Sequence, residues 1–184
     1  MLMLVLVTVP YLIAIAWAPA GKEFLGSFYN SQDTSVYLSA IRAGARGDWL
    51  RTLPFTSEPH EPAIYYPFYL LIGHLAPPTL LTFHIARLLC AALMIFAAWW
   101  LITTILSDQT ERRIAIILSA LGMGLGWVVL VAGLGPVIHP TDIFSPTATL
   151  LNAAILNPHF PLGAALQFAT LALYLQAQHA PYRQ

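Results

Sequence analysis

Charged side chains are scarce in this 184-residue chain, in which 9% of the residues are charged and 58% are hydrophobic. A typical soluble domain has about 25% charged residues and about 45–50% apolar residues. So few charges could not cover the surface of a soluble fold of this size, and the composition therefore predicts an integral membrane protein. The formal net charge is zero and no basic run is present, which argues against nucleic acid as a partner.

Cysteine and zinc-binding motifs are also nearly absent. Cys90 is the single cysteine, so it cannot form a disulfide within the chain. The sequence has no His-x-x-x-His or Cys-x-x-Cys pattern that would predict a zinc site. A signal peptide would begin with a basic region, but no Lys or Arg precedes Lys22. We therefore expect residues 1–20 to form a retained helix rather than a cleaved leader.

What the chain has in quantity is long apolar runs, and these predict an all-α membrane protein. A helix needs about 20 apolar residues to cross a bilayer. We expect one membrane domain with about four transmembrane helices, over residues 1–20, 79–106, 114–134 and 162–178. Three closely spaced glycines in the third span, Gly122, Gly124 and Gly126, are expected to allow close helix packing in lipid.

Two polar segments, 21–62 and 135–161, separate the predicted spans. Four spans place both segments on the same side of the membrane. The short connector 107–113 has the higher density of Arg, which favours the inside for the connector and the outside for the two segments. Residues 64–76 are short and rich in Tyr, which indicates a re-entrant or interfacial segment.

Within the first polar segment, residues 34–46 have the spacing of an amphipathic helix that lies along the membrane surface. Tyr37 and Ile41 would form its apolar face. Asp33 directly precedes this helix. It could be the N-cap, whose carboxylate accepts a backbone N–H, or a general base at the membrane surface. The two roles are compatible, because capping would fix the position of the carboxylate.

Other polar residues also have two interpretations each. His60 lies between Glu58 and Glu61, a group that could bind a metal ion or a substrate hydroxyl, or could form a solvated turn. Asn157 and His159 stand before the fourth span, where they could line an outer cavity or mark the start of a helix.

Arg87 lies near the start of the second span, and an ionisable group at membrane depth is a functional candidate. Its guanidinium could hold a lipid phosphate. Alternatively, it could extend to the interface or pair with a neighbouring helix.

The order of these features resembles the N-terminal part of the GT-C-fold glycosyltransferases, polytopic enzymes that take sugars from polyprenyl-phosphate donors. The resemblance lies in an early loop Asp, an amphipathic helix, a Tyr/Pro-rich segment and a span that opens with His-Ile-Ala-Arg. The segments that carry the resemblance are Tyr65-Tyr66-Pro67-Phe68-Tyr69, His84-Ile85-Ala86-Arg87 and Asn157-Pro158-His159-Phe160. The chain is most similar to uncharacterised bacterial membrane proteins of this type, so we expect it in a bacterial cytoplasmic membrane.

The resemblance implies that Asp33 deprotonates the acceptor hydroxyl. Arg42, Arg46 or Arg87 would then stabilise the departing phosphate. Membrane lipids and a polyprenyl-phosphate sugar would be the partners, and a divalent metal ion is left open as a cofactor. Two features depart from the family. Gln32 stands where many members have a second acidic residue, and members have about twice as many spans, so we expect an N-terminal fragment that could be inactive by itself.

Two other functions are compatible with the sequence. A transporter fragment would place polar residues at mid-membrane in several spans, and apart from Arg87 these are scarce. A non-catalytic membrane subunit would have no convergent pocket. The enzyme hypothesis instead predicts a cleft, open toward lipid, that Asp33 shares with His60 or His159 at a separation on the order of 10 Å. Arg87 or Arg42 would lie near its mouth.

Overall fold

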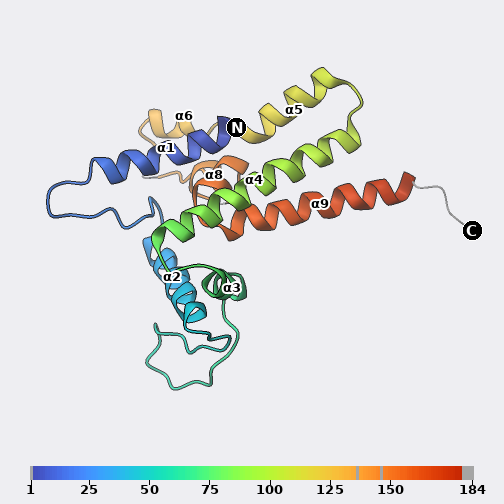
Figure 1. Cartoon of the computed structure of the whole chain (residues 1–184). Helices are drawn as coiled ribbons and strands as arrows, with labels where there is room; N and C mark the ends of the chain where they lie inside the picture. Colours follow the sequence, from blue (N-terminus) through green and yellow to red (C-terminus); the bar gives the residue numbers. More distant parts are fainter. Residues whose placement is uncertain (1, 136, 146, 180–184) are drawn as a thin grey trace, which may run out of the picture. The chain divides into compact units, whose positions relative to one another are not determined.

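The computed structural model describes residues 2–135, 137–145 and 147–179, and in these ranges the chain is helical without a β-strand. It forms two compact units (Figure 1). The first unit comprises Met1–Trp17 and Arg87–Gln184, and the second comprises Ala18–Ala86. The boundary falls within a continuous helix, α4 (Leu80–Ile105). That the two units act as one membrane domain stays a prediction.

The second unit is built on α2 (Ser31–Ala45) and α3 (Pro67–Leu75), which lie side by side in Figure 1. Glycines allow this close contact. A Cβ atom on Gly44 would meet the carbonyl oxygen of Leu70, and one on Gly73 would meet that of Ile41. The two helices therefore pack backbone against backbone, as small residues permit. The expected helix is confirmed, although it begins three residues earlier than the sequence predicts, and its position along the membrane surface stays a prediction.

Stacked aromatic rings form the core of the second unit. The rings of Tyr37 and Tyr69 are stacked with centroids 4.4 Å apart, and Tyr69 is stacked on Phe83 at 6.3 Å. Ile41 is fully buried in the same cluster. The prediction that Tyr37 and Ile41 face apolar groups is confirmed. Burying this face holds α2 in place.

Among its described residues, the first unit contains seven helices, counting the larger part of α4. The short helix α8 lies against α1, α5 and α9, around a core of small and flexible side chains such as Ala91, Met94 and Ala154. Small residues let the helices approach closely. The other helices are α1 (Leu2–Ala16), α5 (Gln109–Leu121), α6 (Gly126–Val131), α7 (Thr141–Phe144), α8 (Leu150–Ile155) and α9 (His159–His179).

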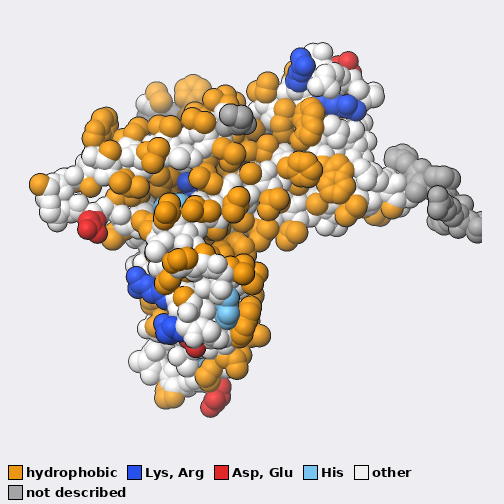
Figure 2. All heavy atoms as spheres, in the orientation of Figure 1, with side chains coloured by type: hydrophobic (Ala, Val, Ile, Leu, Met, Phe, Trp, Pro, Cys, Tyr) orange, Lys and Arg blue, Asp and Glu red, His pale blue; other side chains and the backbone are white. Residues whose placement is uncertain are grey.

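Three segments of the described chain are long and apolar enough to cross a membrane: α4, Gln109–Val131 and His159–Gln178. Helix α1 has 15 residues, fewer than the roughly 20 that a spanning helix needs. The structure is therefore compatible with an integral membrane protein, whereas four spans stay a prediction. Leu89, Phe96 and Leu166 are each more than 60% exposed, and Figure 2 shows such apolar side chains over much of the surface. Lipid is the environment that would cover them.

The third predicted span, 114–134, is not one continuous helix. It is interrupted at residues 122–125, between α5 and α6. The backbone N–H of Gly126 donates to Oδ2 of Asp142 at 2.8 Å, and a Cβ on Gly124 or Gly126 would collide with the Asp142 side chain. These glycines therefore admit a carboxylate to the backbone, where the sequence had predicted contact with another helix.

Candidate functional site

Asp33 is the third residue of α2 and not its N-cap, so the predicted capping role is wrong. The N-cap position belongs to Asn30, whose left-handed backbone (φ 52°) starts the helix earlier. Asn tolerates this conformation better than most residues. The Asn30 side-chain amide donates to the Asp33 carboxylate and orients it. A carboxylate in the first turn is also stabilised by the helix dipole.

Asp33 lines a cavity of about 680 Å³ between α2 and the loop that follows it. This volume is within the range of about 300–1,000 Å³ that is usual for small-ligand sites. Asp33 is the one charged side chain among the described residues that line the cavity, and much of the wall is apolar or aromatic. The lining residues are Gln32, Asp33, Ser35, Val36, Leu53, Phe55, Thr56 and Tyr66. An oriented carboxylate in an otherwise uncharged cavity suits a general base.

Tyr66, in the wall of this cavity, has an unusual backbone. Its φ of 59° is rare for a bulky residue, and such strained residues gather at functional sites. The Tyr66 ring packs edge-on against Tyr37 at 5.5 Å. Burial raises the pKa of Tyr37, and the nearby Asp33 and Tyr66 raise it further. Tyr37 therefore keeps its phenolic proton at neutral pH.

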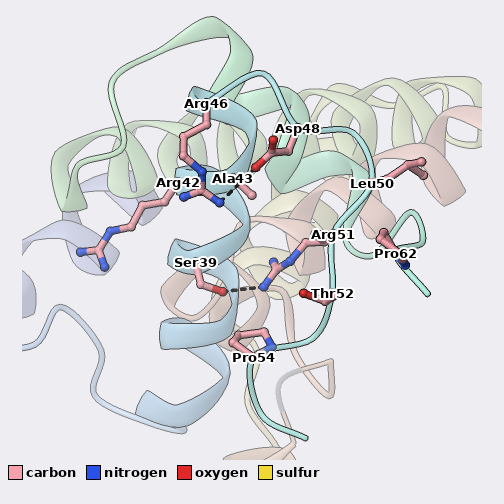
Figure 3. A pocket seen from close by; sticks show the side chains of 10 residues that line it. All are labelled: Ser39, Arg42, Ala43, Arg46, Asp48, Leu50, Arg51, Thr52, Pro54 and Pro62. Atoms are coloured by element: carbon pink, nitrogen blue, oxygen red, sulfur yellow. Dashed lines mark hydrogen bonds and ion pairs between the residues drawn. The ribbon is translucent and has the colours of Figure 1, made fainter. Parts of the chain in front are cut away.

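A second cavity, of about 440 Å³, contains three arginines (Figure 3). Arg42 and Arg46 were predicted site residues, and Arg51 was not. Arg46 forms an ion pair with Asp48 at 3.0 Å, and both side chains are substantially exposed. The cavity is lined by Ser39, Arg42, Ala43, Arg46, Asp48, Leu50, Arg51, Thr52, Pro54 and Pro62. One carboxylate among three guanidinium groups leaves the cavity positively charged.

Arg51 is held rigidly in this cavity. Its backbone exchanges two hydrogen bonds with Ala63, at 3.0 and 3.1 Å, and its Nη2 donates to Oγ of Ser39 at 2.8 Å. Only 7% of the residue is exposed, and Nη1 is buried without a hydrogen-bond partner among the described residues. Burial lowers the pKa of the Arg51 guanidinium, nearby Tyr66 raises it and Arg46 lowers it. Nothing in the sequence distinguishes Arg51 from the other arginines, because its burial arises only from the fold.

The two cavities lie one after the other along α2. Asp33 and Val36 line the first, and Ser39, Ala43 and Arg46 line the second. A rise of 1.5 Å per residue places Ser39 about 9 Å along the helix from Asp33. The loop over residues 50–56 supplies walls to both cavities.

His60 stabilises this loop and does not line either cavity. Its Nε2 accepts the backbone N–H of Leu53 at 3.0 Å, so Nε2 carries no proton. Nδ1 lies 3.1 Å from the carbonyl oxygen of Glu61 and donates to it in the neutral tautomer. Both ring nitrogens are therefore engaged by the backbone. His60 supports a wall of the Asp33 cavity through Leu53.

Arg87, in the first unit, is almost completely buried, with 1% of its surface exposed. Its Nη1 donates to the carbonyl oxygens of Val7 and Ala154, at 3.2 and 2.8 Å, and its Cζ lies 4.3 Å from the centre of the Tyr11 ring. These contacts correspond to the alternative that Arg87 pairs with neighbouring helices. Its contact with a donor phosphate stays a prediction.

Asn157 and His159 both lie at the start of α9 in the first unit. Asn157 is buried, and its carbonyl oxygen accepts the N–H of Phe160. His159 lines a cavity of about 350 Å³, whose wall combines polar residues such as Thr149 and Gln167 with apolar ones such as Phe160. Asp33 belongs to the other unit, so its predicted approach to His159 stays a prediction.

No group of three or more His, Cys, Asp or Glu side chains is placed to hold a metal ion in the part of the chain that the structure describes. Glu58 and Glu61, which flank His60, are exposed. No protein-family model, curated protein or solved structure matches this chain. The two cavities on α2 are therefore interpreted from their own geometry and chemistry.

Proposed function

We propose that this chain is part of a membrane glycosyltransferase of the GT-C type, which moves a sugar from a polyprenyl-phosphate donor to an acceptor hydroxyl. One observation carries the proposal: a cavity with a single oriented carboxylate and a cavity rich in arginine lie one after the other along α2, and the loop over residues 50–56 lines both. Sugar transfer from a phosphate needs both groups, because one end of the reaction releases a proton and the other releases an anion.

In the proposed reaction, Asp33 accepts the proton of the acceptor hydroxyl. The acceptor oxygen attacks the anomeric carbon, and the bond from that carbon to the phosphate oxygen breaks. The phosphate leaves with the electron pair, and the arginines stabilise its charge. A base, an attacking oxygen, a carbon and a leaving phosphate extend over a distance on the order of 10 Å. The rise of about 9 Å along the axis of α2 from Asp33 to Ser39, whose hydroxyl accepts from Arg51, is of this order.

The proposal includes a topology. Residues 1–20, 79–106, 114–134 and 162–178 would cross a bacterial cytoplasmic membrane, and the segments 21–62 and 135–161 would lie outside. Helix α2 would rest at the membrane surface, where a donor with an embedded isoprenoid tail presents its phosphate. The exposed apolar surface of α4 and α9 supports a lipid environment.

Replacement of Asp33 by Asn tests the base. Asn keeps the shape of the side chain and can still contact Asn30, but it cannot accept the proton. We expect Asp33→Asn to reduce transfer from a polyprenyl-phosphate sugar by about 10²–10⁴-fold, the usual contribution of a general base. The measurement is the initial rate in membranes that contain the protein, normalised to its amount.

Glu58→Gln is the matched control, because Glu58 is an exposed carboxylate that lines neither cavity. It should retain the original rate. A near-normal rate in Asp33→Asn would remove the proposed base. Absence of transfer in the unsubstituted protein would favour the alternative, a non-catalytic membrane subunit or transporter fragment.

A further inference from the structure

The buried guanidinium of Arg51 has a donor atom, Nη1, that no group in the described chain satisfies. A buried cation that lacks an anionic partner is costly, so such a group is retained most readily where a ligand completes its contacts. We propose that Arg51 is the fixed anion-binding residue of a phosphoryl-oxyanion site on α2, with Arg42 and Arg46 as mobile partners. That this oxyanion is the phosphate of the sugar donor rests on the proposed function.

The surroundings of Arg51 prepare it to bind. Its backbone N–H and its carbonyl oxygen both form hydrogen bonds with the backbone of Ala63, and its Nη2 donates to the hydroxyl of Ser39. Figure 3 shows the Arg51 side chain reaching toward Ser39 on α2. A guanidinium that is already fixed loses little conformational entropy when a ligand arrives. Its second nitrogen, Nη1, is left to bind an oxyanion.

Arg42 and Arg46 differ from Arg51 in their freedom. Both are exposed, Arg42 in the last turn of α2 and Arg46 at its C-cap. Figure 3 shows that Arg42 extends away from Arg51 and that Arg46 reaches toward Asp48. Exposed ion pairs such as Arg46–Asp48 are weak, so a stronger anion can displace the carboxylate. The two side chains can therefore turn onto a ligand that Arg51 has already bound.

The chemistry of the cavity favours a phosphoryl group over other anions. Planar guanidinium forks match the paired oxygens of phosphate and form short, charge-assisted hydrogen bonds with them. Three arginines oppose the single carboxylate of Asp48, which leaves an excess of two positive charges for the ligand. A cavity of about 440 Å³ accommodates a phosphate together with a group attached to it.

If Arg51 had a purely structural role, its side chain would act only through the hydrogen bond from Nη2 to Ser39. That role would not explain why Nη1 is buried without a hydrogen-bond partner among the described residues. The structural role also predicts that Arg51 variants change the stability of the loop and leave anion affinity unchanged. The two interpretations can therefore be separated by a binding measurement.

The experiment measures binding of three probes to the purified chain in detergent by titration calorimetry: inorganic phosphate, pyrophosphate and a polyprenyl monophosphate. We expect Arg51→Gln to weaken binding of the preferred probe by about 10- to 100-fold, the effect of losing one charge-assisted contact. Arg42→Gln and Arg46→Gln should weaken it less, because these side chains are exposed. Arg113→Gln removes an exposed arginine near the start of α5 and should bind as the original protein does.

Ser39→Ala protects the test against a folding defect. It removes the contact that orients Arg51 but keeps the charge, and we expect it to weaken binding less than Arg51→Gln does. Tight binding of only the polyprenyl probe identifies the oxyanion as a lipid headgroup, and tight binding of soluble probes identifies a free phosphate. Failure of all three to bind overturns the proposal, and so does unchanged affinity in a folded Arg51→Gln protein or equal loss in Arg113→Gln. Binding without sugar transfer would overturn the proposed function alone.

Discussion

The guanidinium of Arg87 donates a hydrogen bond to the backbone carbonyl oxygen of Ala154, at 2.8 Å. Ala154 lies in the last turn of α8, where backbone carbonyls have no partner within the helix. The hydroxyl of Tyr11 donates to the next carbonyl, that of Ile155. Side chains from α4 and α1 thus complete the C-terminus of α8, and a positive charge suits that end of a helix.

We expect Arg87→Met to destabilise the protein by about 3 kcal/mol. The change leaves the carbonyls of Val7 and Ala154 without their charged donor, and hydrogen bonds to charged groups are worth about 1.5–3 kcal/mol each. Arg87→Lys should lose less, because it keeps one cation but not the planar fork. The measurement is the unfolding midpoint in detergent. Unchanged stability combined with a higher KM for the donor would instead assign Arg87 to phosphate binding.

His60→Ala should loosen the loop that borders both cavities. The change removes the acceptor for the Leu53 N–H, a loss of about 1 kcal/mol of local stability. Hydrogen exchange at the Leu53 amide should accelerate several-fold as a result. His139→Ala, a change in the first unit, is the control and should leave that amide unaffected. Normal protection of Leu53 in His60→Ala would show that other contacts hold the loop.

Gly126→Ala should destabilise the first unit by about 1–3 kcal/mol, the usual cost of inserting a methyl group into occupied space. The new Cβ would collide with the Asp142 carboxylate and with Pro140, and the bond from the Gly126 N–H to Asp142 would be strained. Gly163→Ala is the matched control, because nothing lies within 4 Å of its Cβ position in α9. Helix propensity predicts that this control is stabilised by up to about 1 kcal/mol. Equal thermal midpoints for the two variants would contradict the interpretation.

The four-span topology places Ser57 and Thr141 on the same side of the membrane. Both residues are exposed, so single cysteines there should react with a membrane-impermeant thiol reagent applied from outside to intact cells. The background is Cys90→Ala, which removes the single natural cysteine. Neither position is buried, so whether the reagent reacts depends only on the side of the membrane on which the residue lies. Labelling at one site and not the other would rule out four spans.

Local patterns in the sequence predicted several helices well. The apolar run 79–106 became α4, and the spacing of Tyr37 and Ile41 marked the buried face of α2. Both predictions depend on periodicity within one helix, which is a local property. The boundaries were less accurate where backbone geometry decided them, as at Asn30, whose left-handed conformation starts α2 before Asp33.

Composition and apolar run length by themselves determined that the chain is helical and suited to a membrane, because a shortage of charge and runs of about 20 apolar residues leave few other solutions. Only the tertiary structure decided the roles of Arg51, Arg87 and His60. Each depends on a partner distant in the sequence: Ser39 and Ala63 for Arg51, Ala154 for Arg87, and Leu53 for His60. A side chain's burial and its hydrogen-bond partners arise from packing between segments, and one sequence does not specify which segments meet.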